Sequence, residues 1–162
     1  MRSFATDLRR RHIEEKERSW LRADIPQIAE LMEQLSAEYN SDSQHDAGES
    51  RRIKWLHNTF NDAWHYVHVI RVAEKIEAIA CLARSHLPEL NGLVHSVYVT
   101  PEFRGYGFGR RVTMGVIDYA RSVHMHSLEM PVSKNPIARK LYESLGFEYC
   151  DYEGVLLMVK VL

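Results

Sequence analysis

The stretch that decides the fold is VTPEFRGYGFGRR, residues 99–111, in which glycine stands at positions 105, 107 and 109. An apolar run typical of a strand, residues 93–99, precedes it, and apolar residues at helical spacing follow from position 112 to 123. Glycine lets the main chain approach a ligand closely, and the N–H groups of a helix's first turn point out of its end. Because the helix dipole adds positive potential there, the loop is predicted to bind a phosphate or pyrophosphate.

Two nucleotide-binding motifs are excluded at particular residues of this loop. A P-loop ends in Gly-Lys-Ser/Thr, whereas Gly109 is followed by Arg110 and Arg111. The dinucleotide fingerprint G-x-G-x-x-G would begin at Gly105 and requires a third glycine where Arg110 stands. Taken alone, the loop also permits a simpler interpretation, a glycine-rich turn that only links a strand to a helix.

A second pattern distinguishes these interpretations, because residues 135–147 read NPIARKLYESLGF. The spacing Arg104-x-x-Gly107-x-Gly109 resembles the pyrophosphate loop (R/Q-x-x-G-x-G/A) of the GCN5-related N-acetyltransferase (GNAT) family. The later segment resembles that family's other signature, N-x-x-A-x-x-x-Y-x-x-x-G-F. The two patterns in this order, joined by a predicted strand, extend the resemblance over residues 18–161.

The element order predicted from the residues is β-α-α-β-β-β-α-β-α-β-β, an α+β (mixed α/β) chain with one layer of sheet and helices on its faces. A strand is expected at residues 20–23, a helix N-cap at Asp24 and a polar loop at residues 41–48. The resemblance implies a single GNAT-type domain over residues 18–162, after an N-terminal extension of residues 1–17. Its sheet would be mostly antiparallel, with six or seven strands splayed at the acetyl-CoA site and about four helices.

The resemblance also implies roles in an acetyl-CoA site. The main chain of residues 97–99 would bind the pantetheine amides and polarise the thioester carbonyl. N–H groups of the glycine loop would hold the pyrophosphate, Asn135 would bond the pantetheine arm, and Ala138 would be small enough to let the cofactor pass. The expected cofactor contacts are Val97, Tyr98, Val99, Arg104, Gly105, Tyr106, Gly107, Phe108, Gly109, Arg110, Asn135, Ala138, Arg139 and Tyr142.

Tyr142 is the residue on which catalysis depends in this interpretation. By resemblance it would point at the sulfur of CoA and act as the general acid. The residues around it also permit a structural role, since Tyr142 shares an apolar helix face with Ile137, Leu141 and Leu145. The spacing from Asn135 favours the catalytic role.

The acceptor side requires a neutral amine. A lysine-like amine with a pKa near 10.4 costs about 4.6 kcal/mol to deprotonate at pH 7, so a base is expected unless the acceptor is weakly basic. His95 is the first candidate, because strict alternation would place it on the strand face of Val97 and Val99, opposite Ser96. Glu129, on the following strand, is the second candidate, and a relay without a single base remains open.

Composition excludes several other classes. The 162 residues are 45% apolar and 27% charged, as in one ordinary folded domain, and 21 Lys+Arg against 22 Asp+Glu argue against a nucleic-acid binder. Two cysteines, Cys81 and Cys150, predict neither a disulfide scaffold nor a zinc site, and the histidines lack H-E-x-x-H spacing, so no metal is expected. No apolar run approaches a membrane span of about 18 residues, and we expect a cytoplasmic protein without membrane partners.

The predicted function is therefore acetyl-CoA-dependent N-acetylation of a primary amine, small molecule or peptide, by direct attack in a ternary complex. Acidic and aromatic residues between positions 33 and 64, among them Glu38 and Tyr39, favour a cationic acceptor. The apolar residues 155–161 permit a homodimer. The alternative is a domain that binds acyl-CoA as a sensor or interaction module and has lost transfer, although the presence of Tyr142 argues against it.

Overall fold

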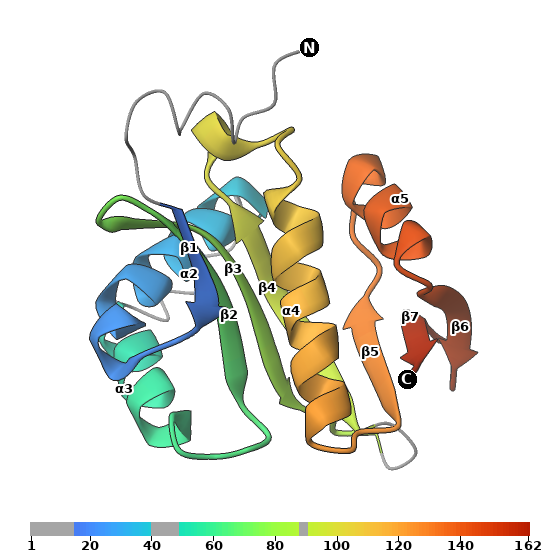
Figure 1. Ribbon diagram of the computed structural model, residues 1–162. Coiled ribbons are helices and arrows are strands. Elements are labelled where there is room, and N and C mark those ends of the chain that lie inside the picture. The colour runs from blue at the N-terminus through green and yellow to red at the C-terminus, as the bar shows by residue number, and fades with distance from the viewer. Residues whose placement is uncertain (1–14, 40–48, 88–90) are drawn as a thin grey trace.

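The computed structural model describes residues 15–39, 49–87 and 91–162 (Figure 1). Within these ranges seven strands form one sheet in the order β1-β2-β3-β4-β5-β7-β6. Neighbouring strands are antiparallel except for the parallel pair β4–β5. The strands are β1 (Glu15–Ser19), β2 (Tyr66–Val72), β3 (Lys75–Arg84), β4 (Gly92–Val99), β5 (Ser127–Pro131), β6 (Glu148–Tyr152) and β7 (Val155–Val161).

Helices cover both faces of this sheet (Figure 1). The helix α4 packs on β2, β3 and β4, whereas α2 packs on β3, β4 and α3. Two neighbouring residues of β4 show the two faces: the Tyr98 hydroxyl reaches Glu38 of α2, and Val99 lies next to Gly109 of α4. The helices are α2 (Ile25–Tyr39), α3 (Glu49–Thr59), α4 (Phe108–Ser122) and α5 (Pro136–Ser144), with short 3-10 turns η1 (Arg22–Asp24) and η2 (Pro101–Phe103).

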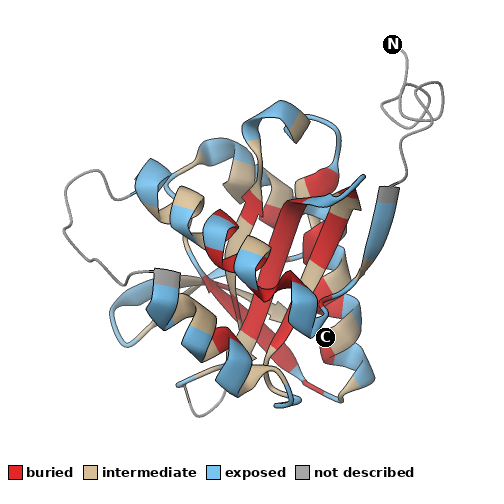
Figure 2. Ribbon diagram, turned by 90° about the vertical axis from the view of Figure 1, so that its left-hand side faces the viewer, coloured by how far each residue is buried: buried red, intermediate tan, exposed pale blue. Residues whose placement is uncertain are grey.

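The core lies between the strands and the inward faces of the helices, where buried positions concentrate (Figure 2). On α4 the apolar spacing seen in the sequence corresponds to buried Val112, Val116 and Ala120. The sequence-based expectation of a mixed α+β domain with one sheet of six or seven strands is confirmed. The helix count also agrees within the described residues.

The position of the N-terminal strand differs from the prediction. The strand expected at residues 20–23 is wrong: β1 is Glu15–Ser19 and pairs with β2, whereas residues 22–24 form the turn η1. The segment EKERS has too little apolar alternation to indicate a strand, as is common at charged sheet edges. This strand takes in residues 15–17, which were assigned to the N-terminal extension. The rest of the extension and the loop expected at residues 41–48 lie outside the described residues.

Asp24 was expected to be only a helix cap, and its surroundings are more elaborate. Its side chain is 2% exposed and accepts hydrogen bonds from Arg18 at 2.7 and 3.1 Å, Arg71 at 3.0 Å and the Leu21 N–H at 2.7 Å. Burial alone would raise the pKa of this carboxyl, but these hydrogen bonds and the two guanidinium charges hold its pKa below the usual range. Asp24 therefore joins β1, β2 and the start of α2.

The sheet opens between β4 and β5. These strands pair only at Gly92–Leu128 and Leu93–Glu129, and beyond that point they diverge (Figure 1). Within the described ranges, main-chain groups of β4 beyond residue 93 therefore have no strand partner on this side. The predicted splay is confirmed, and it exposes the main chain of residues 97–99 to a ligand.

A bulge in β4 changes which side chains share a face. Ser96 has a φ of 49°, and the register with β3 moves from Cys81–His95 to Ile79–Tyr98. Two residues of β4 thus stand opposite one residue of β3, which is the geometry of a β-bulge. His95 consequently shares a face with Tyr98, not with Val97 and Val99. The face predicted for His95 from strict alternation was wrong, because the bulge inserts one residue.

Candidate active site

A groove of about 460 Å³ lies at the splay, and we call it the splay groove. It holds every residue expected to contact acetyl-CoA except Tyr106 and Arg139, and it adds six that the motifs did not indicate. The lining residues are Leu35, Glu38, Tyr39, Val97, Tyr98, Val99, Phe103, Arg104, Gly105, Gly107, Phe108, Gly109, Arg110, Asn135, Ile137, Ala138, Leu141 and Tyr142.

The glycine loop presents its main chain to this groove. Gly105 and Gly107 have φ values of 80° and 85°, which side chains rarely adopt, and a Cβ at either would meet no heavy atom of the described residues within 4 Å apart from its chain neighbours. Gly107 is the residue that precedes α4, so the first-turn N–H groups of that helix point toward the same opening. Gly109 differs, because a Cβ there would make ordinary contacts with Leu141 at 3.4 Å and Val99 at 3.7 Å.

Tyr142 lies on α5 at the wall of the groove. Its side chain is 6% exposed, and its ring packs edge-on against Phe147 with centroids 6.3 Å apart. Burial, with a smaller contribution from nearby Tyr39, raises the pKa of Tyr142 to about 12. The phenol is therefore protonated at neutral pH and can donate its proton or a hydrogen bond. The ring is thus packed, as the structural interpretation expects, and the residue also lines the groove, where the catalytic interpretation requires it.

The remaining polar residues of the cofactor set hold α5 and its loop in place. Asn135 caps α5 by accepting the Ile137 N–H at 2.9 Å on Oδ1, which leaves its Nδ2 group available to donate to a ligand. Arg139 donates to the Ser133 carbonyl at 2.9 Å and supports the loop before α5. Arg110 donates to the Ser144 hydroxyl at 2.8 Å and joins α4 to α5.

Arg104 crosses the groove to α2. Its Nη2 lies 2.6 and 2.9 Å from the two carboxylate oxygens of Glu38, and its Nε donates to the Val99 carbonyl at 2.9 Å. The Tyr98 hydroxyl donates to the same carboxylate at 2.8 Å, and the guanidinium lies 5.5 Å from the Tyr98 ring centroid. Burial alone would raise the pKa of Glu38, but the bonds from Arg104 and Tyr98 hold its pKa below the usual range.

His95 does not line the splay groove. Its ring packs against Trp55 of α3 with centroids 5.8 Å apart, and its Nδ1 lies 3.0 Å from the Ser96 hydroxyl. Its buried Nε2 has no hydrogen-bond partner among the residues that the structure describes. Burial, with a smaller contribution from His65, lowers the pKa of His95 to about 4. His95 is therefore neutral at pH 7 and a weaker base than an ordinary histidine.

Glu129 also lies away from the groove. It is 5% exposed on β5, where its Cα pairs with Leu93 and Val159, and its carboxylate accepts a hydrogen bond from the Ser85 hydroxyl. Neither base candidate thus contacts the groove directly. In the described part of the chain, no group of three or more His, Cys, Asp or Glu side chains could hold a metal ion. No helix of the described ranges is long and apolar enough to cross a membrane.

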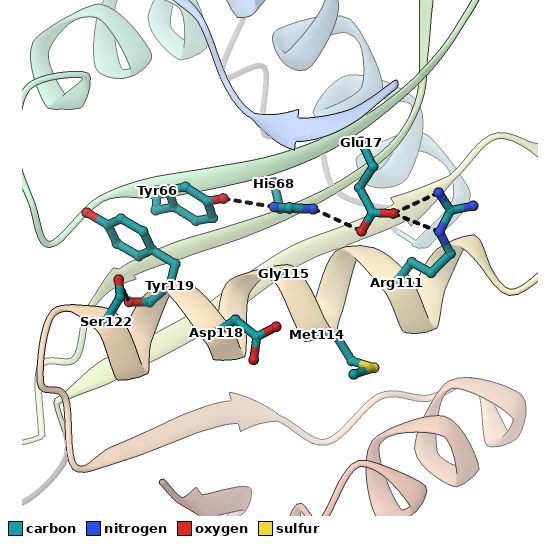
Figure 3. A pocket seen from close by; sticks show the side chains of 9 residues that line it. All are labelled: Glu17, Tyr66, His68, Arg111, Met114, Gly115, Asp118, Tyr119 and Ser122. Atoms are coloured by element: carbon teal, nitrogen blue, oxygen red, sulfur yellow. Dashed lines mark hydrogen bonds and ion pairs between the residues drawn. The ribbon is translucent and has the colours of Figure 1, made fainter. Parts of the chain in front are cut away.

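A second pocket, of about 450 Å³, lies between β2 and α4, and we call it the β2–α4 pocket (Figure 3). A polar chain runs along it: Tyr66 bonds His68 Nδ1 at 2.8 Å, His68 Nε2 bonds Glu17 at 3.1 Å, and Glu17 pairs with Arg111 at 2.7 Å. A Cβ at Gly115 would overlap the His68 ring. These polar groups bind one another, which explains how they are tolerated beside the helix.

The family of the chain follows from a match to a family model. The model described as the acetyltransferase (GNAT) family matches residues 28–147, a stretch that contains the splay, the glycine loop and Tyr142. The chain therefore belongs to the GNAT family of acetyltransferases, a class of acyltransferases whose donor is acetyl-CoA.

Curated relatives agree with this assignment. The N-alpha-acetyltransferase RimI of Mycobacterium tuberculosis is 32% identical over 128 residues, which are 78% of this chain and 74% of that protein. The uncharacterized protein ML0378 of Mycobacterium leprae is 33% identical over 127 residues, which are 78% of this chain but only 32% of that longer protein.

Solved structures share the fold. One of them, yncA from Salmonella typhimurium, contains its cofactor acetyl-CoA and superposes with a TM-score of 0.72. The match covers 91% of this chain and 92% of that chain at 21% sequence identity, a level at which the likeness concerns the fold.

Proposed function

We propose that this chain transfers the acetyl group of acetyl-CoA to a primary amine, by direct attack of the amine on the thioester in a ternary complex. A C–N bond forms, the C–S bond breaks, the amine loses one proton and the CoA thiolate gains one. One observation supports the proposal most strongly. The splay groove is lined by residues 97–99, whose main chain has no partner from β5, by Gly105 and Gly107, and by Tyr142.

The acceptor that fits best is an α-amine, of a peptide or of an amino acid. At pH 7 an α-amino group with a pKa of 7.7–8.0 costs only about 1 kcal/mol to deprotonate, against about 4.6 kcal/mol for a lysine-like amine. A weak or distant base is therefore sufficient to deprotonate an α-amine but not a lysine-like amine. His95, with a pKa of about 4, and Glu129, bonded to Ser85, both lie away from the groove. The name of the M. tuberculosis relative, an N-alpha-acetyltransferase, points the same way.

Tyr142 acts on the leaving group in this proposal. An ordinary thiol has a pKa of about 8.5, so complete transfer from a phenol of pKa about 12 to the thiolate would be uphill by about 5 kcal/mol. Tyr142 therefore assists by donating a hydrogen bond as charge develops on sulfur, and the thiolate takes up the proton that the amine releases. A hydrogen bond to a charged group contributes about 1.5–3 kcal/mol.

His95 and Glu129 remain candidates for the base, reached from the groove through a relay. The dependence of kcat/KM on pH tests them, because a histidine base of pKa about 4 adds no inflection near neutral pH beyond that of the acceptor amine at about 7.7–8.0. Loss of turnover in both His95→Gln and Glu129→Gln, with unchanged acetyl-CoA binding, would support a relay. Unchanged turnover in both variants would indicate that the neutral form of the acceptor amine reacts without a base from the protein.

The test of the function is calorimetric titration with acetyl-CoA and CoA, together with thiol release over a panel of amines. Micromolar binding and release that depends on an α-amine support the enzyme. Binding without release from any amine points instead to the alternative function, an acyl-CoA sensor module. Absence of binding contradicts the assignment of the splay groove.

We also propose a cytoplasmic homodimer. The exposed apolar side chains of Val155, Leu156 and Val161 on β7 support association of two copies. Light scattering on the purified chain measures this directly, and a monomer at micromolar concentration would contradict it.

A further inference from the structure

The Arg104–Glu38 pair occupies groups that the cofactor needs. Arg104 is the first residue of the pyrophosphate motif, yet its charge is bound to Glu38 and its Nε to the carbonyl of Val99. That carbonyl belongs to the main-chain segment expected to bind the pantetheine amides. Acetyl-CoA can therefore use the Arg104 charge only if Nη2 leaves Glu38, and it can replace the Nε bond at the Val99 carbonyl only if the guanidinium moves away.

The pair can be broken at small cost. The side chains of Arg104 and Glu38 are 47% and 36% exposed, and ion pairs at such positions change equilibria by about two- to fivefold. A pyrophosphate carries more charge than one carboxylate and offers oxygens to the same guanidinium. Cofactor binding is thus expected to draw Arg104 to the phosphates.

Glu38 then becomes the uncompensated charge of the groove. It keeps the hydrogen bond from Tyr98 but loses its cation, and it lies at the C-terminal end of α2, next to Tyr39. Tyr39 and Tyr142 line the same groove, and they are close enough to interact electrostatically. Glu38 therefore lies in the same groove as Tyr142, the residue proposed to assist the leaving group, and it can reach an acceptor that enters this groove.

We propose that Glu38 recognises a positive charge on the acceptor beside the reacting amine, and that Arg104 masks Glu38 until acyl-CoA binds. The inference rests on the proposed function, whose substrate class it narrows to cationic α-amine acceptors. Because the exchange links two binding events, each ligand must raise the affinity for the other by the same factor.

The experiment is calorimetric titration of two peptides that differ in one charge, one beginning Ala-Lys and the other Ala-acetyl-Lys, with and without saturating CoA. CoA replaces acetyl-CoA so that no turnover occurs. The proteins are the wild type, Glu38→Gln and the control Glu30→Gln. Glu30 lies on the same helix and outside the splay groove, and its substitution by Gln removes the same single charge.

In the wild type, CoA should raise the affinity for the lysine peptide about two- to fivefold and leave the neutral peptide unchanged. Glu38→Gln should abolish this coupling and the preference for lysine, while CoA alone binds about twofold or more tightly because Arg104 is already released. Glu30→Gln should behave as the wild type does.

Two outcomes would overturn the proposal. One is the absence of coupling in the wild type; the other is a Glu38→Gln protein that binds CoA and both peptides more weakly, as a purely structural ion pair requires. Thiol release tests the proposed function, whereas the charge-dependent coupling in binding tests this inference. The two failures can therefore be distinguished, because thiol release can be absent while the coupling persists.

Discussion

The splay groove and the β2–α4 pocket, of which Figure 3 shows the latter, have similar volumes but are built in opposite ways. The groove offers main chain and glycines with open space before them. In the β2–α4 pocket, Tyr66, His68, Glu17 and Arg111 bind one another, and Gly115 is required by packing, not by a ligand. A pocket whose polar groups already have partners stabilises the fold, whereas a pocket whose backbone lacks strand partners is suited to a ligand.

The largest expected effect is on the pH dependence of folding stability, and it comes from His95, which lies outside both pockets. His95 has an unpartnered Nε2 and a pKa lowered by burial to about 4, against about 6.5 in the unfolded chain. The unfolded chain then binds more protons between these values, so the stability present above pH 6.5 falls by about 3 kcal/mol as the pH drops to 4. Urea unfolding at several pH values measures this loss. His95→Leu should flatten the profile between pH 6.5 and 4, and a variant that keeps the wild-type slope would contradict the prediction.

The second prediction compares two buried tyrosines whose pKa values are both raised to about 12. Tyr142→Phe should lower kcat about 10- to 150-fold through loss of the hydrogen bond to sulfur, with acetyl-CoA affinity within about threefold. Tyr66→Phe, in the β2–α4 pocket, should leave kcat unchanged. Steady-state thiol release and calorimetry measure both. An equal loss of kcat in the two variants would remove the functional distinction between the regions.

The third prediction concerns the glycine of the β2–α4 pocket. Gly115→Ala should destabilise the fold by about 1–3 kcal/mol, since its methyl group overlaps the His68 ring. For a chain of this size the melting temperature should fall by about 2–4 °C per kcal/mol. Acetyl-CoA affinity of the folded protein should not change. The double variant with His68→Ala should recover part of the loss; additive destabilisation would assign it to another contact.

The smallest expected effect separates two glycines of the splay groove. Gly107→Ala places a methyl group in the space before α4 that the cofactor is proposed to fill, so acetyl-CoA affinity should fall about tenfold through overpacking; the strain of about 1–2 kcal/mol at a φ of 85° lowers stability instead. Gly109→Ala should change the affinity less than about threefold, because its methyl group makes only ordinary contacts. Calorimetry with acetyl-CoA measures both. Equal affinities would mean that the loop adapts to either substitution.

Most of the site could be predicted from sequence because its chemistry depends on the main chain. A motif with glycines at 105, 107 and 109 specifies a backbone path nearly by itself, and the spacing from Asn135 to Tyr142 specifies one helix face. Glu38 was only one acid among several in the sequence. Its position against Arg104 depends on two segments 66 positions apart, and no local pattern reports such a contact.

The sequence by itself determined the fold class, the order of the elements and the loop where the cofactor is expected, since hydrophobic period and glycine placement are local properties of the chain. Tertiary structure decided the face of His95, through a one-residue bulge at Ser96, and the partners of Arg104. Those depend on strand register and on the packing of α2 against β4. Such contacts form only when distant segments meet, and their physical cause is therefore absent from any single stretch of sequence.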